Sequence, residues 1–234
     1  MGRTVRIVGG ASIVLAPLLF GIGDQVRMVA DPPTEAGIVG EYGIEEATAS
    51  LAMINANRAT FVVASYLFYV AMLLTIPALL AIWRISVARA PRWAWTGAVL
   101  AMLFALGQVV HLVGHFAMSQ VFAAHDDLTT AAELTLAAES NAFIMALFVP
   151  LYLVGLLATI PQAVGLRRAR VIPLWATLCL VAGTVLFVVA GSTPATSAIW
   201  TVLLVTGLAP AASAMLRGAV DPAAPRTQPV AATA

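Results

Sequence analysis

The stretch Trp93–Phe122, WAWTGAVLAMLFALGQVVHLVGHFAMSQVF, decides the fold class of this chain. It contains no Asp, Glu, Lys or Arg. An α-helix rises about 1.5 Å per residue, so about 20 apolar residues cross the hydrocarbon core of a bilayer, and this stretch is longer than that. We therefore predict a membrane-spanning helix here.

The rest of the chain repeats this pattern of long apolar runs separated by short charged segments. Hydrophobic residues make up 61% of the sequence and charged residues only 10%, whereas a soluble domain has roughly 25% charged residues. We predict an all-α, polytopic membrane helix bundle in contact with the lipid bilayer. The net charge of +1 does not indicate nucleic-acid binding, and no feature of the sequence indicates an oligomeric state. The six predicted spans are residues 6–23, 59–83, 93–122, 141–166, 171–191 and 196–216.

The two ends of the chain need separate interpretation. Arg3 and Arg6 precede the first span, as in a secretory signal, but Gly21–Gly23 is a poor small-x-small cleavage site, so we interpret this segment as a span. The six-helix domain covers residues 1–218. The Pro/Ala-rich tail at 219–234 is predicted to be disordered and cytoplasmic.

The charged residues predict the orientation. Ten of the 12 basic residues fall on one side of the predicted spans, and ten of the 11 acidic residues fall on the other. By the positive-inside rule the arginine side is cytoplasmic. We therefore expect a multi-pass protein of the cell (inner) membrane with both termini in the cytoplasm. The basic set is Arg3, Arg6, Arg84, Arg89, Arg92, Arg167, Arg168, Arg170, Arg217 and Arg226. The acidic set is Asp24, Asp31, Glu35, Glu41, Glu45, Glu46, Asp126, Asp127, Glu133 and Glu139.

A shift of the sequence against itself indicates an internal repeat. Thr75–Pro77 aligns with Thr159–Pro161, and Pro91 and Trp93 align with Pro173 and Trp175 after a gap. Each unit reads as an outer amphipathic segment (43–57 and 129–140), a span, a short arginine loop and a second span. Because the shift crosses two spans, we predict a parallel two-span repeat.

Part of the second unit carries a family resemblance. Gly165–Arg168 and Val171–Trp175, with the Asn-containing entry to the second span, resemble an uncharacterised family of six-span bacterial integral membrane proteins of unknown function. The resemblance covers spans two to five. It implies the six-span topology and a bacterial origin, and it carries no catalytic residue across.

The third span contains three polar residues, Gln108, His111 and His115, whose spacing places them on one helical stripe. Ionisable residues inside a membrane are costly and are functional candidates by default. Three interpretations stay open for the histidines: hydrogen bonding between helices, a catalytic or substrate-binding pocket, or ligation of a metal or haem. Two histidines on one helix do not reach opposite faces of a haem, and no further ligands have diagnostic spacing. We therefore predict no cofactor, with a metal at His111 and His115 as an alternative.

Further polar residues are expected at the same depth, in the outer half of the bundle. Glu139 and Asp24 are the candidate proton donors, with His111 or His115 as the partner. The two interpretations of Arg27 are a pair with Asp24 and a clamp on an anionic or carbonyl-bearing substrate. The remaining candidate substrate-binding residues are Gln108, Tyr66, Tyr69, Phe122, Asn57, Arg58 and Asn141, of which the tyrosines and Phe122 would face a cationic intermediate.

These residues favour an integral membrane enzyme of cyclase or isomerase type that acts on a lipophilic small molecule by acid–base chemistry. The chain is similar in size to membrane-bound terpene and meroterpenoid cyclases and also has an acid beside aromatic residues. The alternative is a non-enzymatic protein: a small carrier, a ligand, metal or haem sensor, or an assembly subunit. A carrier is less favoured because the sequence shows no pair of Gly/Pro-broken spans at the midplane. Walker A, dinucleotide-binding, Cys-x-x-Cys and Gly-x-Ser-x-Gly motifs are absent.

Overall fold

All regular elements in the described part of the chain are helices, which confirms the all-α class. The tail at 219–234 lies outside the described residues, as do Glu35 and Glu41. The computed structural model describes residues 2–32, 43–149, 151–152, 155–191 and 193–218, without the side chains of Glu139, Ile144 and 147–149. The helices are α1 (Arg3–Ala30), α2 (Ile44–Ala56), α3 (Arg58–Val87), α4 (Pro91–His111), the π-helix η1 (Leu112–Ala117), α5 (Met118–Phe122), α6 (Leu128–Glu139), α7 (Ala142–Val149), α8 (Thr159–Arg168), α9 (Leu174–Ala190) and α10 (Pro194–Arg217).

Four helices are long and apolar enough to cross a membrane. They are α1 with 28 residues, α3 with 30, the continuous helix Pro91–Phe122 with 32, and α10 with 24. They contain the predicted first, second, third and sixth spans. The first is longer than predicted: α1 continues beyond residue 23 to Ala30, because the charged side chains in its last turns pair with one another.

The predicted fourth and fifth spans differ from these four long helices, because one is interrupted and the other is shorter. Residues 141–166 do not form one helix in the described part of the chain, because α7 and α8 are separated by a π-helical pair at 151–152 and a turn at 157–158. The fifth, α9, is a regular apolar helix of 17 residues. The structure thus shows four long apolar helices, one shorter apolar helix and one interrupted segment, and the count of six spans stays a prediction.

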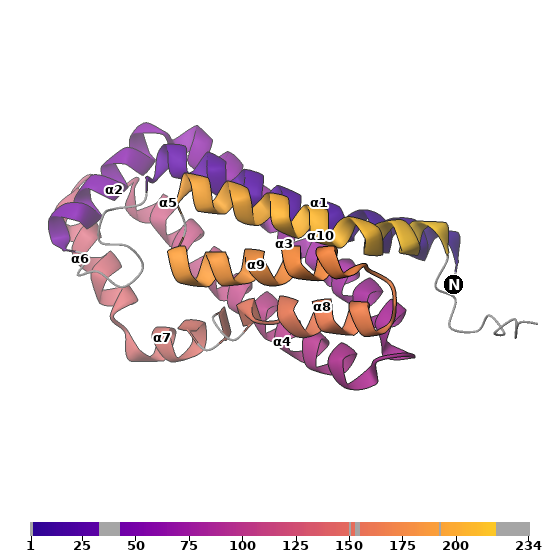
Figure 1. Cartoon of the computed structure of the whole chain (residues 1–234). Coiled ribbons are helices and arrows are strands. Elements are labelled where there is room, and N and C mark those ends of the chain that lie inside the picture. Colours follow the sequence, from indigo (N-terminus) through magenta and orange to yellow (C-terminus); the bar gives the residue numbers. More distant parts are fainter. Residues whose placement is uncertain (1, 33–42, 150, 153–154, 192, 219–234) are drawn as a thin grey trace, which may run out of the picture.

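The two amphipathic segments are helices, as predicted, and they pack together. In α2 the buried side chains are Ala47, Leu51 and Ile54, which recur at helical spacing, and they share a core with Ala131 and Ala132 of α6. Figure 1 shows α2 and α6 together at the end of the bundle where α1 finishes. This pair covers that end of the long helices.

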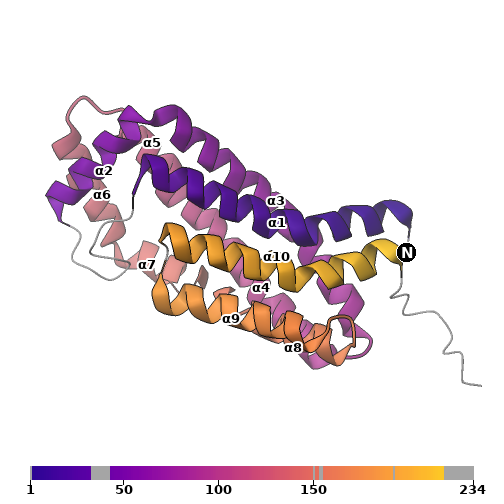
Figure 2. The same ribbon diagram turned by 45° about the horizontal axis from the view of Figure 1, so that its top comes forward.

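The long helix α1 lies along both α3 and α10, as Figures 1 and 2 show. Its small residues bring the backbones close: a Cβ atom on Gly9 would stand 2.9 Å from Ala81 Cβ, and one on Gly10 would stand 2.6 Å from Leu216 Cγ. Small residues are typical of helix contacts in lipid, where close van der Waals packing holds helices together. This packing gives α1 a fixed rotation, and therefore a fixed direction for its polar side chains.

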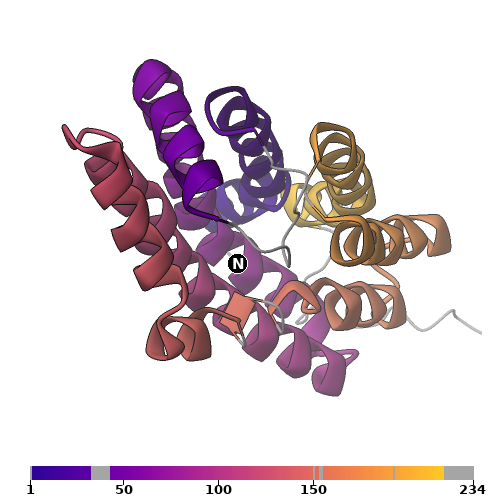
Figure 3. The same cartoon turned by 90° about the vertical axis from the view of Figure 1, so that its left-hand side faces the viewer.

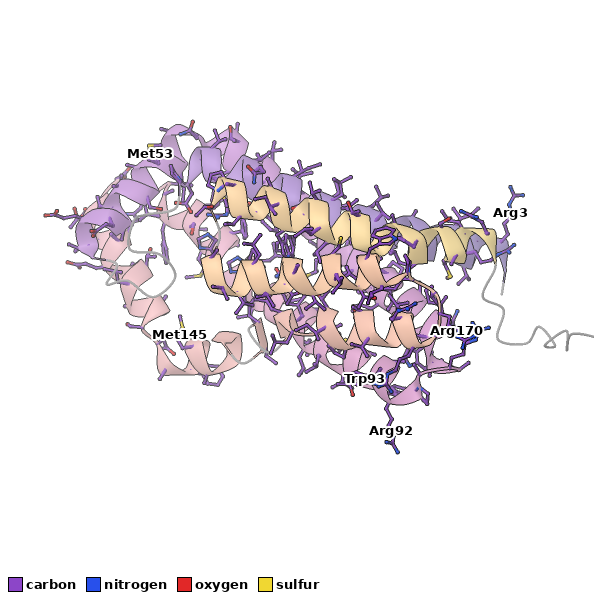
Figure 4. All side chains as sticks on the ribbon, in the orientation of Figure 1. Arg3, Met53, Arg92, Trp93, Met145 and Arg170 are labelled. Carbon is purple, nitrogen blue, oxygen red and sulfur yellow. The ribbon has the colours of Figure 1, made fainter. Side chains whose placement is uncertain are left out.

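The charges separate toward the two ends of the bundle. Arg3, Arg92 and Arg170 come from distant parts of the chain and lie at one end, here called the arginine end, in Figure 4. The opposite end, here called the acidic end, holds the last turn of α1 together with α2 and α6. Figure 3 looks along the bundle from the acidic end, with α9 and α10 on one side and α6 on the other.

Candidate functional site

The densest group of charged side chains lies at the acidic end, on the last turns of α1. Arg27 contacts Asp24 through Nη2 and Nε, both 3.1 Å from Asp24 Oδ1, and Arg27 Nη1 lies 3.5 Å from Asp31 Oδ2. Asp24 is 5% exposed and Asp31 is 8% exposed. The predicted pairing of Arg27 with Asp24 is therefore confirmed, and Arg27 also pairs with a second acid.

Asp31 connects α1 to two other helices. Its Oδ1 accepts a hydrogen bond of 2.7 Å from Ser50 Oγ in α2. Its Oδ2 lies 3.7 Å from His115 Nε2 in η1. A carboxylate beside an imidazole nitrogen can fix the orientation of the ring. Asp31 was not among the predicted site residues.

The two histidines are arranged by a π-helical turn. The helix that begins at Pro91 changes to π-helix over Leu112–Ala117, so His111 precedes the widened turn and His115 lies within it. Their rings are parallel, with centroids 5.1 Å apart and planes inclined by 1°. Short π-helical turns inside α-helices occur frequently at functional sites.

Aromatic side chains enclose the histidines on one side. The Phe116 ring is 1% exposed and stands edge-on to both imidazoles, with centroids 5.4 Å from His111 and 5.2 Å from His115. Phe116 in turn packs on Phe61 and Phe68 of α3 at 5.5 and 4.7 Å. The histidines therefore lie at a boundary between the charged cluster and an aromatic core.

Tyr152 and Gln108 extend the polar group toward the middle of the bundle. The Tyr152 ring centroid is 5.8 Å from that of His111. Gln108 is 5% exposed, and its side chain interacts with that of Tyr152. Tyr152 was not a predicted site residue, because it lies in an apolar run with no spacing that singles it out.

Other predicted residues lie elsewhere. Tyr66 and Tyr69 are 67% and 49% exposed on the surface of α3. Asn57 Nδ2 donates to Met53 O at the end of α2, and Arg58 is exposed at the start of α3. These four do not converge on the histidines.

Three predicted residues sit near the junctions of the short helices. Phe122 packs against the core shared by α2, α3 and α6. Asn141 is exposed, and its Oδ1 accepts a 3.0 Å hydrogen bond from the Phe143 backbone. Glu139 ends α6, and its side chain is outside the described part of the structure. The role predicted for Glu139 stays a prediction.

The loop before α6 provides an exposed acid for contrast. Asp127 caps α6 by accepting hydrogen bonds from the Thr129 and Thr130 backbones at 3.0 and 3.2 Å. The Thr130 hydroxyl also donates to it at 2.7 Å, and this bond lowers the pKa of the Asp127 carboxyl below its usual value. His125 is exposed and accepts a hydrogen bond from the Asp127 backbone.

A cavity of about 120 Å³ lies in the middle of the bundle, between α1, α3, α4, the segment 155–162, α9 and α10. Its wall is mostly apolar and includes the rings of Phe20, Phe104, Phe187 and Trp200. The interruption between α7 and α8 borders it through Gly155 and its neighbours. In a membrane, irregular backbone is tolerated where protein covers it or where it lines a cavity.

One layer of aromatic rings separates this cavity from the charged cluster. Phe104 lines the cavity, and its ring centroid is 5.6 Å from that of Tyr152, which contacts His111. A second route runs from Phe20 in the cavity wall to Phe68 at 4.7 Å, and on to Phe116. A ligand in the cavity would therefore lie next to the rings that contact the histidines.

Within the described residues, no group of three or more His, Cys, Asp or Glu side chains is arranged to hold a metal ion. Comparison of the chain with protein-family models, curated proteins and solved structures gave no match. The family resemblance noted in the sequence therefore stays a prediction. The site has to be interpreted from its own chemistry.

Proposed function

We propose that this protein is an integral membrane enzyme that isomerises or cyclises a lipophilic small molecule by acid–base chemistry. One observation carries the proposal: contacts run from Asp31 through His115 and His111 to Tyr152, whose ring touches Phe104 in the cavity wall. Proton-exchanging side chains thus lie between a charged cluster at the end of the bundle and an apolar cavity in its middle.

The roles follow from these positions. His111 is the group assigned to exchange a proton with the substrate, whose reacting end would extend from the cavity past Phe104 to Tyr152, the residue that His111 contacts. His115 and Asp31 are positioning residues. The ring of His115 stacks on that of His111, and Asp31 lies beside the far nitrogen of His115. Asp24 and Arg27 supply the fixed charges of the same cluster. Fixed, oriented charges near the reacting atoms are a main source of catalysis in enzymes.

The proposed step balances without a cofactor. A proton moves from the protein to a carbon–carbon double bond of the substrate, which leaves a carbocation. Either another double bond of the substrate attacks this cation and closes a ring, or no ring forms. Loss of a proton from an adjacent carbon back to the protein then completes the reaction. The enzyme returns to its starting protonation state, and no oxidant or reductant is consumed.

The test is incorporation of deuterium from D₂O. Protein in lipid vesicles is incubated with a defined mixture of polyprenyl alcohols and prenylated quinones, and the lipids are analysed by mass spectrometry. We expect the wild-type protein to introduce a single deuterium into one component, and His111→Gln to abolish this. His125→Gln, in the exposed loop, is the matched control and should retain it. Full incorporation by His111→Gln would contradict the assigned role.

We also propose that the chain crosses a bacterial inner membrane six times, with both termini in the cytoplasm. The fourth crossing would combine α7, the residues after it and α8, and the fifth would be α9, whose 17 residues extend about 25 Å. The arginines at one end support this orientation. In a Cys179→Ser background, a thiol reagent added outside the cells should modify Asp126→Cys and leave Arg170→Cys unmodified; the opposite pattern would refute it.

The predicted parallel repeat belongs to the same proposal. The order of elements supports it, since α2, α3 and Pro91–Phe122 are followed by α6, the α7–α8 segment and α9. Each set begins with an amphipathic helix and continues with two apolar segments. The histidine pair occurs in the first set only.

A small carrier is the second candidate, and the interruption between α7 and α8 favours it. Secondary transporters commonly bind their substrates where spanning helices are broken, and this interruption borders the cavity. The two candidates differ in the product: a carrier moves a labelled lipid across the vesicle membrane without introducing deuterium, whereas the enzyme changes its substrate.

A further inference from the structure

The polar atoms in the wall of the central cavity restrict what it can bind. Thr75 Oγ1 donates its proton to Ala71 O at 2.9 Å, and Thr184 Oγ1 donates its proton to Leu180 O at 2.9 Å. Each hydroxyl has therefore used its single donor within its own helix. What each presents to a ligand is an oxygen that accepts hydrogen bonds.

Gln162 extends this set on the side of α8. Its Nε2 points to Gly97 O on α4, at 3.4 Å, which directs one amide donor to the neighbouring helix. The amide oxygen of the same side chain can only accept. Thr75, Thr184 and Gln162 therefore place three acceptors in the cavity wall, which also includes the hydroxyl of Thr159.

The remaining wall excludes charged ligands and favours rings or hydrocarbon. Among the described residues that line the cavity there is no Asp, Glu, Lys, Arg or His, so an ion there would meet no described side chain of opposite charge. Phe20, Phe187 and Trp200 supply aromatic surface, and Phe20 and Phe187 each pack against Trp200 with ring centroids 5.4 and 5.0 Å away. The volume of about 120 Å³ is similar to that of an apolar protein cavity of about 150 Å³ that binds benzene.

We propose that this cavity binds an uncharged lipophilic molecule with one hydroxyl group, or the hydroxyl-bearing end of a longer molecule of that kind. The hydroxyl proton is donated to Oγ1 of Thr75 or Thr184, and the hydrocarbon part packs against the aromatic rings. The identity of this ligand as the substrate rests on the proposed function, whereas the binding itself does not.

The test is photolabelling of the purified full-length protein in detergent with a diazirine-bearing octanol, followed by mapping of the labelled residues. We expect labels on cavity-lining residues of α1, α3, α9 and α10. Unlabelled 1-octanol should compete about fivefold better than octane at equal concentration, which is the ratio expected for one net hydrogen bond. Labels confined to exposed residues such as Val189 would overturn the proposal.

Two variants separate cavity binding from uptake into the detergent. Ala78→Phe places a ring in the cavity, since Ala78 is buried and lines it, and should abolish the competed labelling. The double variant Thr75→Val, Thr184→Val keeps the shape of both side chains and removes two acceptors. It should retain labelling and lose most of the fivefold preference for octanol. If Ala78→Phe does not fold, this second variant alone decides, and an unchanged preference would overturn the proposal.

These results are distinguishable from those of the deuterium experiment. Competed labelling of the cavity by a protein that introduces no deuterium supports this binding site and contradicts the proposed reaction. Deuterium incorporation that survives in Ala78→Phe, with no competed labelling in the wild type, overturns the binding site and leaves the reaction standing.

Discussion

The acidic end and the middle of the bundle satisfy their polar side chains in opposite ways. At the acidic end, Asp31 joins α1 to α2 and to η1, so charged groups hold different helices together. In the middle, the hydroxyls of Thr75 and Thr184 bond to carbonyls of their own helices. Polar residues in the first region therefore determine how helices fit together. The two threonines of the second region do not join helices, and there a contact between helices comes from Gln162, whose Nε2 lies 3.4 Å from Gly97 O.

The largest effect should come from removing the shared cation of the acidic end. Arg27→Leu leaves Asp24 and Asp31 buried without the guanidinium that pairs with both, and breaking a buried ion pair costs about 3 kcal/mol or more. We expect a clear fall in Tm in detergent, measured by a thermal-shift assay. Arg58→Leu, at the other arginine expected on the outer side, is exposed and should change Tm little. Equal effects of the two variants would remove the distinction between the regions.

The next effect concerns the interruption beside the cavity. A Cβ atom on Gly155 would lie 2.5 Å from Phe104 Cα, which is backbone and cannot move aside alone. Gly155→Ala should therefore lower the free energy of unfolding by about 2 kcal/mol, as overpacking does in cores. The control is Gly114→Ala in η1, where a Cβ meets nothing within 4 Å. That variant should be neutral or slightly stabilising.

A smaller effect is expected in the cavity wall. Thr184→Val removes a hydroxyl whose described hydrogen bond stays within α9, so we expect a loss of about 0.6 kcal/mol or less, the average found for polar contacts in membranes. Chemical unfolding in mixed micelles measures this change. A loss as large as that of Arg27→Leu would show that the middle of the bundle also depends on polar contacts between helices.

The smallest effect should come from the exposed acid of the acidic end. Because its folded-state pKa is lowered, Asp127 contributes stability that is present above its unfolded pKa and is lost as the pH falls through its folded pKa. Asp127→Ala should therefore lower Tm slightly at pH 7, and this difference should shrink as the pH falls through the lowered folded-state pKa of Asp127. Melting curves of both proteins across this pH range check the prediction, and a difference that persists at low pH would contradict it.

The long helices could be predicted from the sequence because apolar runs of sufficient length leave few alternatives in a bilayer. The interruption of residues 141–166 could not. This stretch contains no charged residue. Hydropathy does not register that Gly107 and Gly155 let α4 closely approach residues 151, 152 and 155. The end of α1 was also missed, since its extension to Ala30 depends on pairing among charged side chains.

The site could be predicted in part, for a physical reason. His111, His115, Gln108, Asp24 and Arg27 are visible because polar groups stand out in apolar runs, and the structure brings them to one region. Tertiary contacts bring three more residues into that region, and local sequence spacing does not predict these contacts. They are Asp31, Ser50 and Tyr152. Asp31 alone carried a signal, its position four residues after Arg27 on the same helical face. Tyr66 and Tyr69 were predicted as site residues because they lie at the same depth in the bilayer as the histidines. Depth does not specify which face of α3 they occupy.

The π-helical turn at Leu112–Ala117 has a consequence for the comparison of homologous sequences. A π-turn holds one residue more than an α-turn, so deletion of a single residue there, such as Gly114, would restore a regular α-helix. The two flanking segments would then keep nearly their present relative rotation, because the π-turn accommodates the extra residue within about the rotation of an α-turn. His111 and His115 would be three residues apart instead of four. Among homologous sequences, a helix that is one residue shorter here would therefore indicate a chain without the π-turn. A helix of the same length would indicate a chain that shares the histidine spacing.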